Sequence, residues 1–190
     1  MDLNLEQGLV KKAQKNPEAF SQLYEDNYPK IFGYILNRVA NVEIAQDITS
    51  ETFFKALKGI KSFKWKNISF SCWLYRIASN EIANYFRTGK YRPACLDEIA
   101  EPATRHTPHD QVIEAERQFQ LQKDLIDLNK IISQLPIKYQ QVVSLKFFEK
   151  KKIEEICQIL GKKEGTIKSL IHRAVEKIRQ NSNSETFFNK

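Results

Sequence analysis

The sequence has few residues that interrupt helices and no long apolar run. Six glycines and six prolines among 190 residues favour a chain that is mostly helical. No stretch of about 18 apolar residues occurs, so we expect no membrane-spanning helix. The first residues, MDLNLEQGLVKKAQ, contain no apolar segment of signal-peptide length. We therefore expect a cytoplasmic protein that does not insert into a membrane.

Cysteine is scarce, and no catalytic motif stands out. Cys72, Cys95 and Cys157 are odd in number and widely spaced, which excludes a disulfide framework and a C-x-x-C pair. His106 and His109 lie near Cys95, but no carboxylate or fourth ligand is organised around these metal-binding residue types. No glycine-rich phosphate loop, paired catalytic carboxylates or nucleophile motif appears. We expect solvated histidines, no metal, no cofactor and no enzymatic activity.

The net charge of +7 is unevenly distributed along the chain. Residues 55–92 contain nine Lys or Arg and one acidic residue, and residues 128–190 contain thirteen and six. Residues 1–54 and 93–127 are acidic by three and five charges. Two basic segments separated by an acidic one indicate a polyanionic partner that contacts two regions. The alternative is a chance distribution of lysines.

Helical periodicity dominates the first half of the chain, and strand alternation is nearly absent. Asn16 and Pro17 are typical of a helix start, and Pro29 predicts a break or kink in the segment that follows. A helix predicted over 42–57 has five apolar members, Ile44, Ile48, Phe53, Phe54 and Leu57, and its outer side offers Asp47 and Glu51. A loop at 59–69 and a helix over 70–87 complete a compact helical domain.

A second helical domain is predicted after a linker. Prolines and acidic residues without periodicity predict a flexible linker at 93–111, and helical patterns return with Leu121 and Leu125. The predicted fold class is all-α, with two small domains. The predicted boundaries are 1–92 for the first domain, 93–111 for the linker, 112–182 for the second domain and 183–190 for a tail.

The stretch EICQILGKKEGTIKSLIHR, residues 155–173, has the pattern of a helix-turn-helix. Such motifs place a recognition helix at a steep angle across a supporting helix. Cys157 is small enough for a close crossing, and Gly161 tolerates the left-handed backbone of a sharp turn. Ile167 and Ile171 fall on the predicted inward side of the second helix. An ordinary αα-hairpin with a solvated face is the alternative.

The predicted outward side of the second helix has residues that suit DNA. Lys and Arg donate to guanine or phosphate, while Ser and His donate or accept. Gly165 leaves backbone N–H groups near the helix start open to a phosphate. The candidate contacts are Gly165, Thr166, Lys168, Ser169, His172 and Arg173.

Several segments resemble the extracytoplasmic-function (ECF) group of bacterial RNA polymerase sigma factors. AFSQLYEDNYPKIFGYI, DITSETFFKALKGIKSF and SFSCWLYRIASNEIANYFR resemble the first conserved domain of this group, in order and spacing. LPIKYQQVVSLKFFEKKKIEEICQILGKKEGTIKSLIHRAVEKIR resembles the second. Together the matching segments cover about residues 18–88 and 128–179.

This resemblance implies a transcription initiation factor. In the family, the first domain (region 2) docks on the clamp helices of the largest polymerase subunit and opens the −10 promoter element. The second domain (region 4) binds the −35 element and contacts the polymerase flap. The implied partners are core RNA polymerase, promoter DNA and an anti-sigma factor, and we expect a monomer when the chain is free.

The resemblance also implies roles for particular residues. Asp47 and Glu51 match acidic positions of the polymerase-docking helix. Basic and aromatic residues of the 59–69 loop suit an unpaired strand, because bases stack on aromatic rings. Within that loop, Phe63 also suits the core. The candidate −10 contacts are Phe63, Lys64, Trp65, Arg76, Asn80 and Arg87.

One departure concerns the DNA target, and one rival function remains. Leu170 stands where the family often has arginine in the recognition helix. Two interpretations are open, contact with a thymine methyl or packing against the core edge, and the −35 preference is expected to differ from the common one. The rival is a helix-turn-helix regulator that does not act as a sigma subunit. Such regulators usually dimerise on palindromes, and the sequence shows no obvious dimerisation helix.

Overall fold

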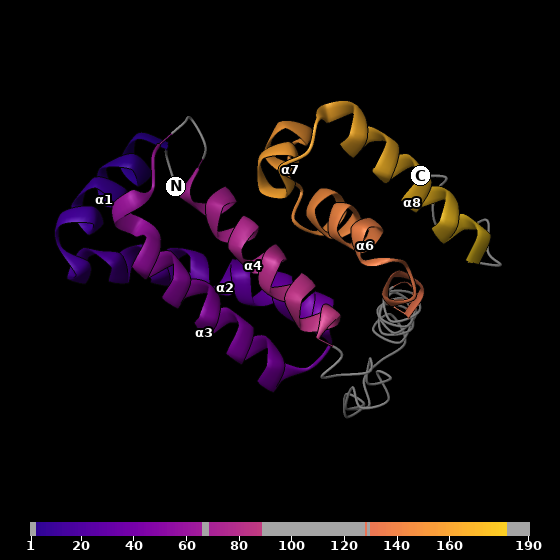
Figure 1. Ribbon diagram of the computed structural model, residues 1–190, viewed down its shortest axis with the longest axis horizontal. Helices are drawn as coiled ribbons and strands as arrows, with labels where there is room; N and C mark the ends of the chain where they lie inside the picture. Colours follow the sequence, from indigo (N-terminus) through magenta and orange to yellow (C-terminus); the bar gives the residue numbers. More distant parts are fainter. Residues whose placement is uncertain (1–2, 66–68, 89–127, 129, 182–190) are drawn as a thin grey trace, which may run out of the picture.

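The computed structural model describes residues 3–65, 69–88, 128 and 130–181. Within these ranges every regular element is helical, which confirms the all-α prediction. The helices form two groups that follow one another along the chain (Figure 1). No helix in the described ranges is long and apolar enough to cross a bilayer.

Some of the sequence predictions lie outside the described residues. These are the linker at 93–111, the tail at 183–190, the periodic residues Leu121 and Leu125, and the trio Cys95, His106 and His109.

The first domain contains four α-helices joined by short connections. Two single 3-10 turns, η1 (Pro17–Ala19) and η2 (Ile60–Ser62), lie between them. The α-helices are α1 (Leu3–Lys15), α2 (Phe20–Val39), α3 (Val42–Gly59) and α4 (Phe70–Arg87).

Side-chain caps explain where three of these elements begin. Asn16 Oδ1 accepts a hydrogen bond from Glu18 N at 3.0 Å, ahead of Pro17. Asn41 Oδ1 accepts from Ile44 N at 2.9 Å, and Ser69 Oγ accepts from Cys72 N at 3.2 Å. Each cap satisfies an N–H group that has no partner inside its helix. Local sequence therefore determines where α3 and α4 start.

Of the two outcomes predicted at Pro29, a break or a kink, the break does not occur. α2 runs through Pro29 without interruption. Proline removes one backbone donor and crowds the preceding turn, but Pro29 is exposed, so the freed carbonyl side faces water. Leu23 and Ile31 are fully buried on either side of it. Tertiary packing on both sides of the proline therefore holds the helix continuous.

α1 was not among the predicted helices. Its short apolar face buries Leu9, Val10 and Ala13 against the rest of the domain. Glu6 adds a polar contact, because its Oε1 accepts a hydrogen bond from Ser71 N of α4 at 3.3 Å. A face this short gives little periodic signal, and packing supplies most of its stability.

The second domain is built on a smaller core. Its elements are α6 (Ile137–Val143), the π-helical turn η3 (Ser144–Phe148), α7 (Ile153–Leu160) and α8 (Glu164–Asn181). Val142, Leu145, Ile156, Ile167 and Ala174 are buried where these elements meet. The core holds α7 and α8 in a fixed relation.

The two domains contact each other where α4 packs against α7 and where α2 packs against η3 (Figure 1). The Tyr75 hydroxyl donates a hydrogen bond to Glu149 Oε2, and Lys151 Nζ lies 4.4 Å from the centroid of the Tyr75 ring. Cys72 Sγ lies 3.6 Å from Glu155 Oε1. Burial, with the hydrogen bond to Glu149, raises the pKa of Tyr75. The phenol is therefore kept protonated as a donor across this interface.

Candidate protein and nucleic-acid interfaces

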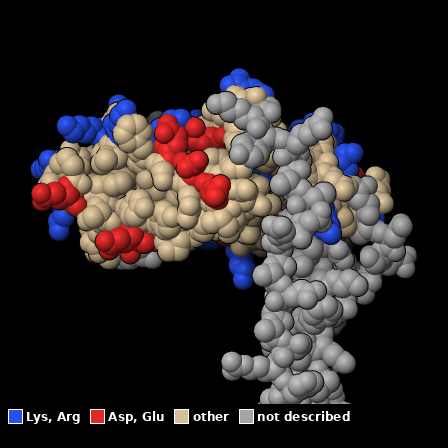
Figure 2. Space-filling model, turned by 90° about the horizontal axis from the view of Figure 1, so that it is seen from below, with Lys and Arg blue, Asp and Glu red and all other residues tan. Residues whose placement is uncertain are grey.

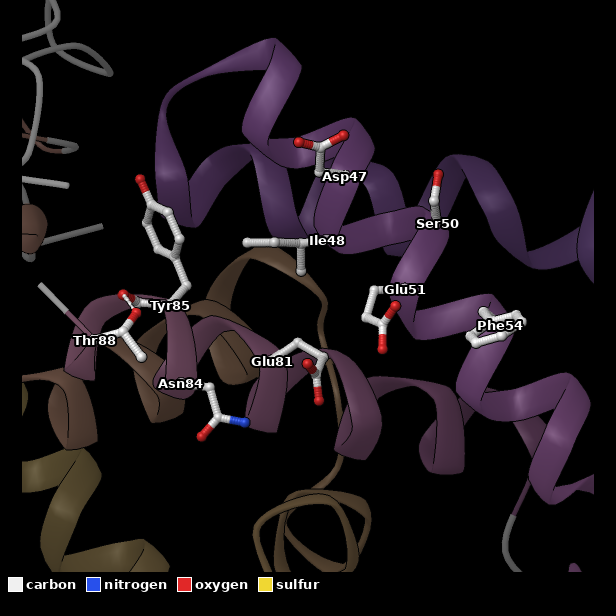
Figure 3. Close-up of a pocket in the computed structure, with 9 residues that line it drawn as sticks. All are labelled: Asp47, Ile48, Ser50, Glu51, Phe54, Glu81, Asn84, Tyr85 and Thr88. Atoms are coloured by element: carbon white, nitrogen blue, oxygen red, sulfur yellow. Dashed lines mark hydrogen bonds between the residues drawn. The ribbon is translucent and has the colours of Figure 1, made fainter. Parts of the chain in front are cut away.

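A hollow lies between α3 and α4 on the first domain. Asp47 and Glu51, predicted to share one side of their helix, both line it from α3 (Figure 3). α4 contributes residues that the sequence did not single out. The lining residues are Asp47, Ile48, Ser50, Glu51, Phe54, Glu81, Asn84, Tyr85 and Thr88.

One lysine links the two helices at this hollow. Lys55 Nζ lies 2.7 Å from Glu81 Oε2 and 3.2 Å from Glu51 Oε1. The hydrogen bond to Glu81, and secondarily that to Glu51, raises the pKa of Lys55. Acidic side chains gather on the face of the molecule seen from below (Figure 2). With three carboxylates and one lysine, the surface remains negative and suits a basic partner.

Phe54 and Leu57, two of the apolar members of α3, lie outside the core. Phe54 is 50% exposed and Leu57 is 40% exposed, while Phe53 is buried. A helix turns 100° per residue, so Phe53 and Phe54 cannot both face inward when only one stripe meets the core. Lys58 Nζ lies 4.0 Å from the centroid of the Phe54 ring. Exposed apolar side chains beside carboxylates are typical of a protein-binding surface.

The loop between α3 and α4 presents Lys64 and holds its aromatic residues against the domain. Gln14 Nε2 donates to Phe63 O at 2.8 Å and fixes the start of the loop on α1. The Phe63 ring packs on Trp73, with centroids 4.7 Å apart, and meets Trp65 edge to face at 6.3 Å. Phe63 and Trp65 are half-buried, and Lys64 is exposed. Phe63 therefore makes the contacts expected of a core residue, the alternative to its role as a −10 contact.

The outer side of α4 carries the remaining first-domain candidates. Arg76, Asn80 and Arg87 are all exposed and recur at helical spacing along α4. A second hollow separates Arg76 and Lys64 from the second domain, where Gln158 of α7 forms its far wall. Of the basic and aromatic residues of the loop and of α4, those that share this hollow with Gln158 of α7 are Phe63, Lys64, Trp73 and Arg76.

The helix-turn-helix has the geometry that its sequence predicted. Gly161 has φ +64°, in the left-handed region, and ends α7. Lys162 N donates to Cys157 O at 3.1 Å across this turn. Ile156 of α7 and Ile167 of α8 are fully buried between the helices. The turn glycine and the inward residue of α8 are thus confirmed as structural features.

The outward candidates on α8 are all exposed, and two belong to ion pairs. Lys168 Nζ lies 2.6 Å from Glu164 Oε1, and His172 Nδ1 lies 3.6 Å from Glu176 Oε2. The exposed set is Gly165, Thr166, Lys168, Ser169, His172 and Arg173.

Leu170 belongs to the opposite flank of α8. It is half-buried and packs against the core. The structure therefore supports the second of the two sequence interpretations, in which Leu170 covers the core edge.

Sequence reasoning missed Glu81, Phe54, Lys55 and Glu164. Glu81 had a usable signal, because it is the only acidic residue between positions 55 and 92. Among the described side chains, no group of His, Cys, Asp and Glu is arranged to hold a metal.

Two family models match the chain in order. The model of Sigma-70 region 2 matches residues 23–91, which include α3, the loop and α4. The model of Sigma-70 region 4 matches residues 125–178, which include the helix-turn-helix.

Several curated proteins are similar over most of the chain. The ECF RNA polymerase sigma factor SigW of Bacillus subtilis is 30% identical over 190 residues, covering 95% of this chain and 97% of SigW. The RNA polymerase sigma-H factor of Pseudomonas aeruginosa is 32% identical, with 91% of each chain covered. The ECF sigma factor BldN of Streptomyces coelicolor is 32% identical over 88% of this chain, which spans only 62% of the length of BldN.

Two solved structures share the fold. CnrH, in complex with the cytosolic domain of CnrY, has a TM-score of 0.66 and 18% identity, covering 94% of this chain and 99% of CnrH. RpoE of Bartonella quintana, in complex with the anti-sigma factor NepR, has a TM-score of 0.64 and 20% identity, covering 87% and 98%. At these identities the similarity concerns the fold.

Proposed function

Because the chain belongs to the ECF sigma factors of RNA polymerase, we propose that it directs core polymerase to particular promoters and opens their −10 element. The observation that carries this proposal is the division of α4 between two unlike surfaces. One side of α4 completes the acidic hollow with Glu81 and Asn84. Another side exposes Arg76, Asn80 and Arg87. One small domain thus has room for a protein partner and a DNA strand together.

The acidic hollow is the proposed polymerase-docking surface. Asp47 and Glu51 supply charge for basic residues of the clamp helices, and Phe54 supplies apolar area at the same place. Charge complementarity steers the encounter, while buried aromatic residues supply much of the affinity at protein interfaces. The region 4 domain is the proposed contact for the polymerase flap.

The loop and the outer side of α4 are the proposed −10 contacts. Lys64, Arg76, Asn80 and Arg87 are exposed and suited to phosphates and base edges. Trp65 lies half-buried at the edge of the aromatic cluster and is the proposed stacking partner for an unpaired base. Stacking of this kind contributes about 1–3 kcal/mol per base, which offsets part of the cost of unpairing.

α8 is the proposed −35 recognition helix. Its first turns expose Lys168, Ser169, His172 and Arg173, and recognition helices contact base edges through their N-terminal residues. Gly165 and Thr166 leave the helix start uncrowded for a phosphate. The half-buried Leu170 is not among the proposed base contacts.

The remaining parts of the proposal concern partners and place of action. The sigma factor RpoE, which shares this fold, was solved in complex with the anti-sigma factor NepR, and we propose an anti-sigma partner for this chain. The protein acts in the cytoplasm, as a monomer when free. It contributes no catalytic residues, because the polymerase performs the chemistry.

Transcription in vitro tests the proposal. The full chain is added to core polymerase of its source organism with fragments of that genome, and start sites are mapped. We expect specific initiation only when both proteins are present. R173A should lose initiation at promoters that need a −35 element, while it still forms the complex with core polymerase on size exclusion.

The helix-turn-helix regulator makes the opposite prediction. Such a protein binds a palindrome tightly by itself and forms no stable complex with core polymerase. That result would replace the sigma assignment.

A further inference from the structure

Glu164 is a carboxylate at the end of α8 proposed to enter the DNA groove. It is the first residue of α8 and is exposed. Thr166 N and Ile167 N both donate to Lys163 O, at 3.0 and 3.1 Å. These hydrogen bonds put the helix start at Lys163 and leave the Glu164 side chain in the first turn. It therefore lies one turn before Lys168, on the same part of the helix surface.

A carboxylate at this place is unfavourable for DNA binding unless it has a partner. Phosphates lie on both sides of a groove, and a negative side chain between them is repelled. Lys168 Nζ, 2.6 Å from Glu164 Oε1, neutralises the charge locally. The pair thus presents one acceptor and one cationic donor side by side at the start of the helix.

Helix stability gives little reason for this pair. The Glu164 and Lys168 side chains are 56% and 60% exposed, and such surface pairs contribute little to folding. An acidic residue in the first turn does favour the helix dipole. A neutral cap residue serves the same helix start without repelling phosphates. Because the Glu164 carboxylate weakens DNA binding and adds little to helix stability, we expect it to make a favourable contact with DNA.

The chemistry of the bases restricts that contact. An ionised carboxylate only accepts hydrogen bonds. In the major groove, guanine and thymine offer a carboxylate only acceptors and a methyl group. Cytosine N4 and adenine N6 are the available donors. In adenine the N7 acceptor lies beside N6 and repels the second carboxylate oxygen, so cytosine is the better partner.

We propose that Glu164 determines one position of the −35 element by accepting a hydrogen bond from the exocyclic amino group of a base, with cytosine preferred. This inference rests on the proposed function, in which α8 reads the −35 element. Lys168 holds the carboxylate and donates to an adjacent guanine or phosphate. Ser169, His172 and Arg173 read neighbouring positions.

A selection experiment with the holoenzyme tests this role. Core polymerase with the full-length chain binds promoters whose −35 element is randomised, and bound sequences are counted. We expect wild type to enrich cytosine at one position by roughly five- to tenfold, the lower part of the range for a good base contact. E164A should lose that preference, and E164Q should move it toward adenine, which pairs well with a glutamine amide.

Glu176 supplies a matched control. It is also an exposed acid of α8 that lies beside a basic side chain four residues away, His172, but it lies three turns further along the helix. E176A removes the same charge, so it should raise affinity for all sequences and leave the base preference intact. If adenine is enriched at that position and lost in E164A, the same amino-group contact is supported through N6.

Two outcomes overturn the inference, and they are distinguishable from a failure of the proposed function. If wild type and E164A have identical base preferences, with or without a uniform change in affinity, Glu164 has a structural role only. If the wild-type holoenzyme selects no −35 sequence at all, both the reading by α8 and the role of Glu164 fail together.

Discussion

At the scale of single residues, Arg38 is the least expected feature of the core. Its guanidinium is buried in α2 at 6% exposure. None of its three nitrogens has a hydrogen-bond partner among the described residues. Burial lowers its pKa, and the neighbouring Tyr34 only partly opposes this effect. A buried charge without partners costs free energy of folding.

We therefore expect R38M to stabilise the protein. Methionine keeps much of the side-chain volume and removes the buried charge, so the free energy of unfolding should rise by about 1–3 kcal/mol. Chemical denaturation of the full chain measures this change. K11M, at an exposed position of α1, controls for the loss of one positive charge. A lower stability of R38M would mean that Arg38 makes a stabilising contact.

At the scale of secondary-structure elements, the turn between α7 and α8 depends on one backbone conformation. Gly161 has φ +64°, which a side chain disfavours. G161A should lower the free energy of unfolding by about 1–2 kcal/mol and weaken −35 recognition by tilting α8. Gly165 is the control, because a Cβ there meets no atom within 4 Å. Thermal unfolding measures the stability of both variants, and G165A should be neutral or slightly stabilising.

A second prediction at this scale concerns the surface shared by α3 and α4 and its affinity for core polymerase. D47A combined with E51A removes two carboxylates from the acidic hollow, so affinity for core polymerase should fall. The expected loss is roughly tenfold or more, since interface residues that matter cost over about 1 kcal/mol each. Fluorescence titration of labelled protein with core polymerase measures it. E25A combined with D26A, two exposed acids of α2, should leave the affinity unchanged.

At the scale of the whole molecule, the described arrangement places the second domain beside part of the surface proposed to contact the −10 element. Gln158 of α7 forms one wall of the hollow beside Lys64 and Arg76. The contact contains polar hydrogen bonds, including Tyr75 with Glu149 and Gln141 Nε2 with Ser79 O at 3.5 Å. Polar interfaces are typical of domains that move relative to each other. Arg76, Asn80 and Arg87 are already exposed, so only DNA that enters the hollow between Lys64 and Gln158 requires the domains to separate.

Y75F tests this requirement. It removes the hydroxyl that donates to Glu149 and keeps the buried ring, and hydrogen bonds to charged groups contribute about 1.5–3 kcal/mol. We expect a larger radius of gyration in X-ray scattering and tighter binding of the free protein to −10 single strands. Y24F, at a partly exposed tyrosine of α2, should change neither. Unchanged scattering in Y75F would show that this contact does not hold the domains together.

The raised pKa of Tyr75 predicts how the hydrogen bond from Tyr75 to Glu149 depends on pH. A phenol whose pKa is raised in the folded state stabilises that state below the ordinary tyrosine pKa of about 10. This stabilisation is lost as the pH rises from there toward the folded pKa. Scattering should therefore show the same compact form at neutral pH and expansion only in alkaline solution.

Local patterns in the sequence were sufficient for much of the fold. The helix over 70–87, the turn at Gly161 and the inward position of Ile167 were predicted from periodicity and backbone preference, and the structure confirms them. These features depend on residues within a few turns of each other. The break at Pro29 does not occur, and the sequence did not distinguish the exposed Phe54 and Leu57 from the buried Phe53, because distant packing decides both.

The sequence by itself determined the family, the two helical domains and the residues that α8 exposes. Family motifs, helical periods and caps are written in neighbouring residues, so a single chain suffices to read them. Only the tertiary structure decided that Glu81 joins Glu51 across two helices, through Lys55, and that α7 lies against α4. These pairings join residues far apart in the chain, and only the packing of the whole molecule brings them together.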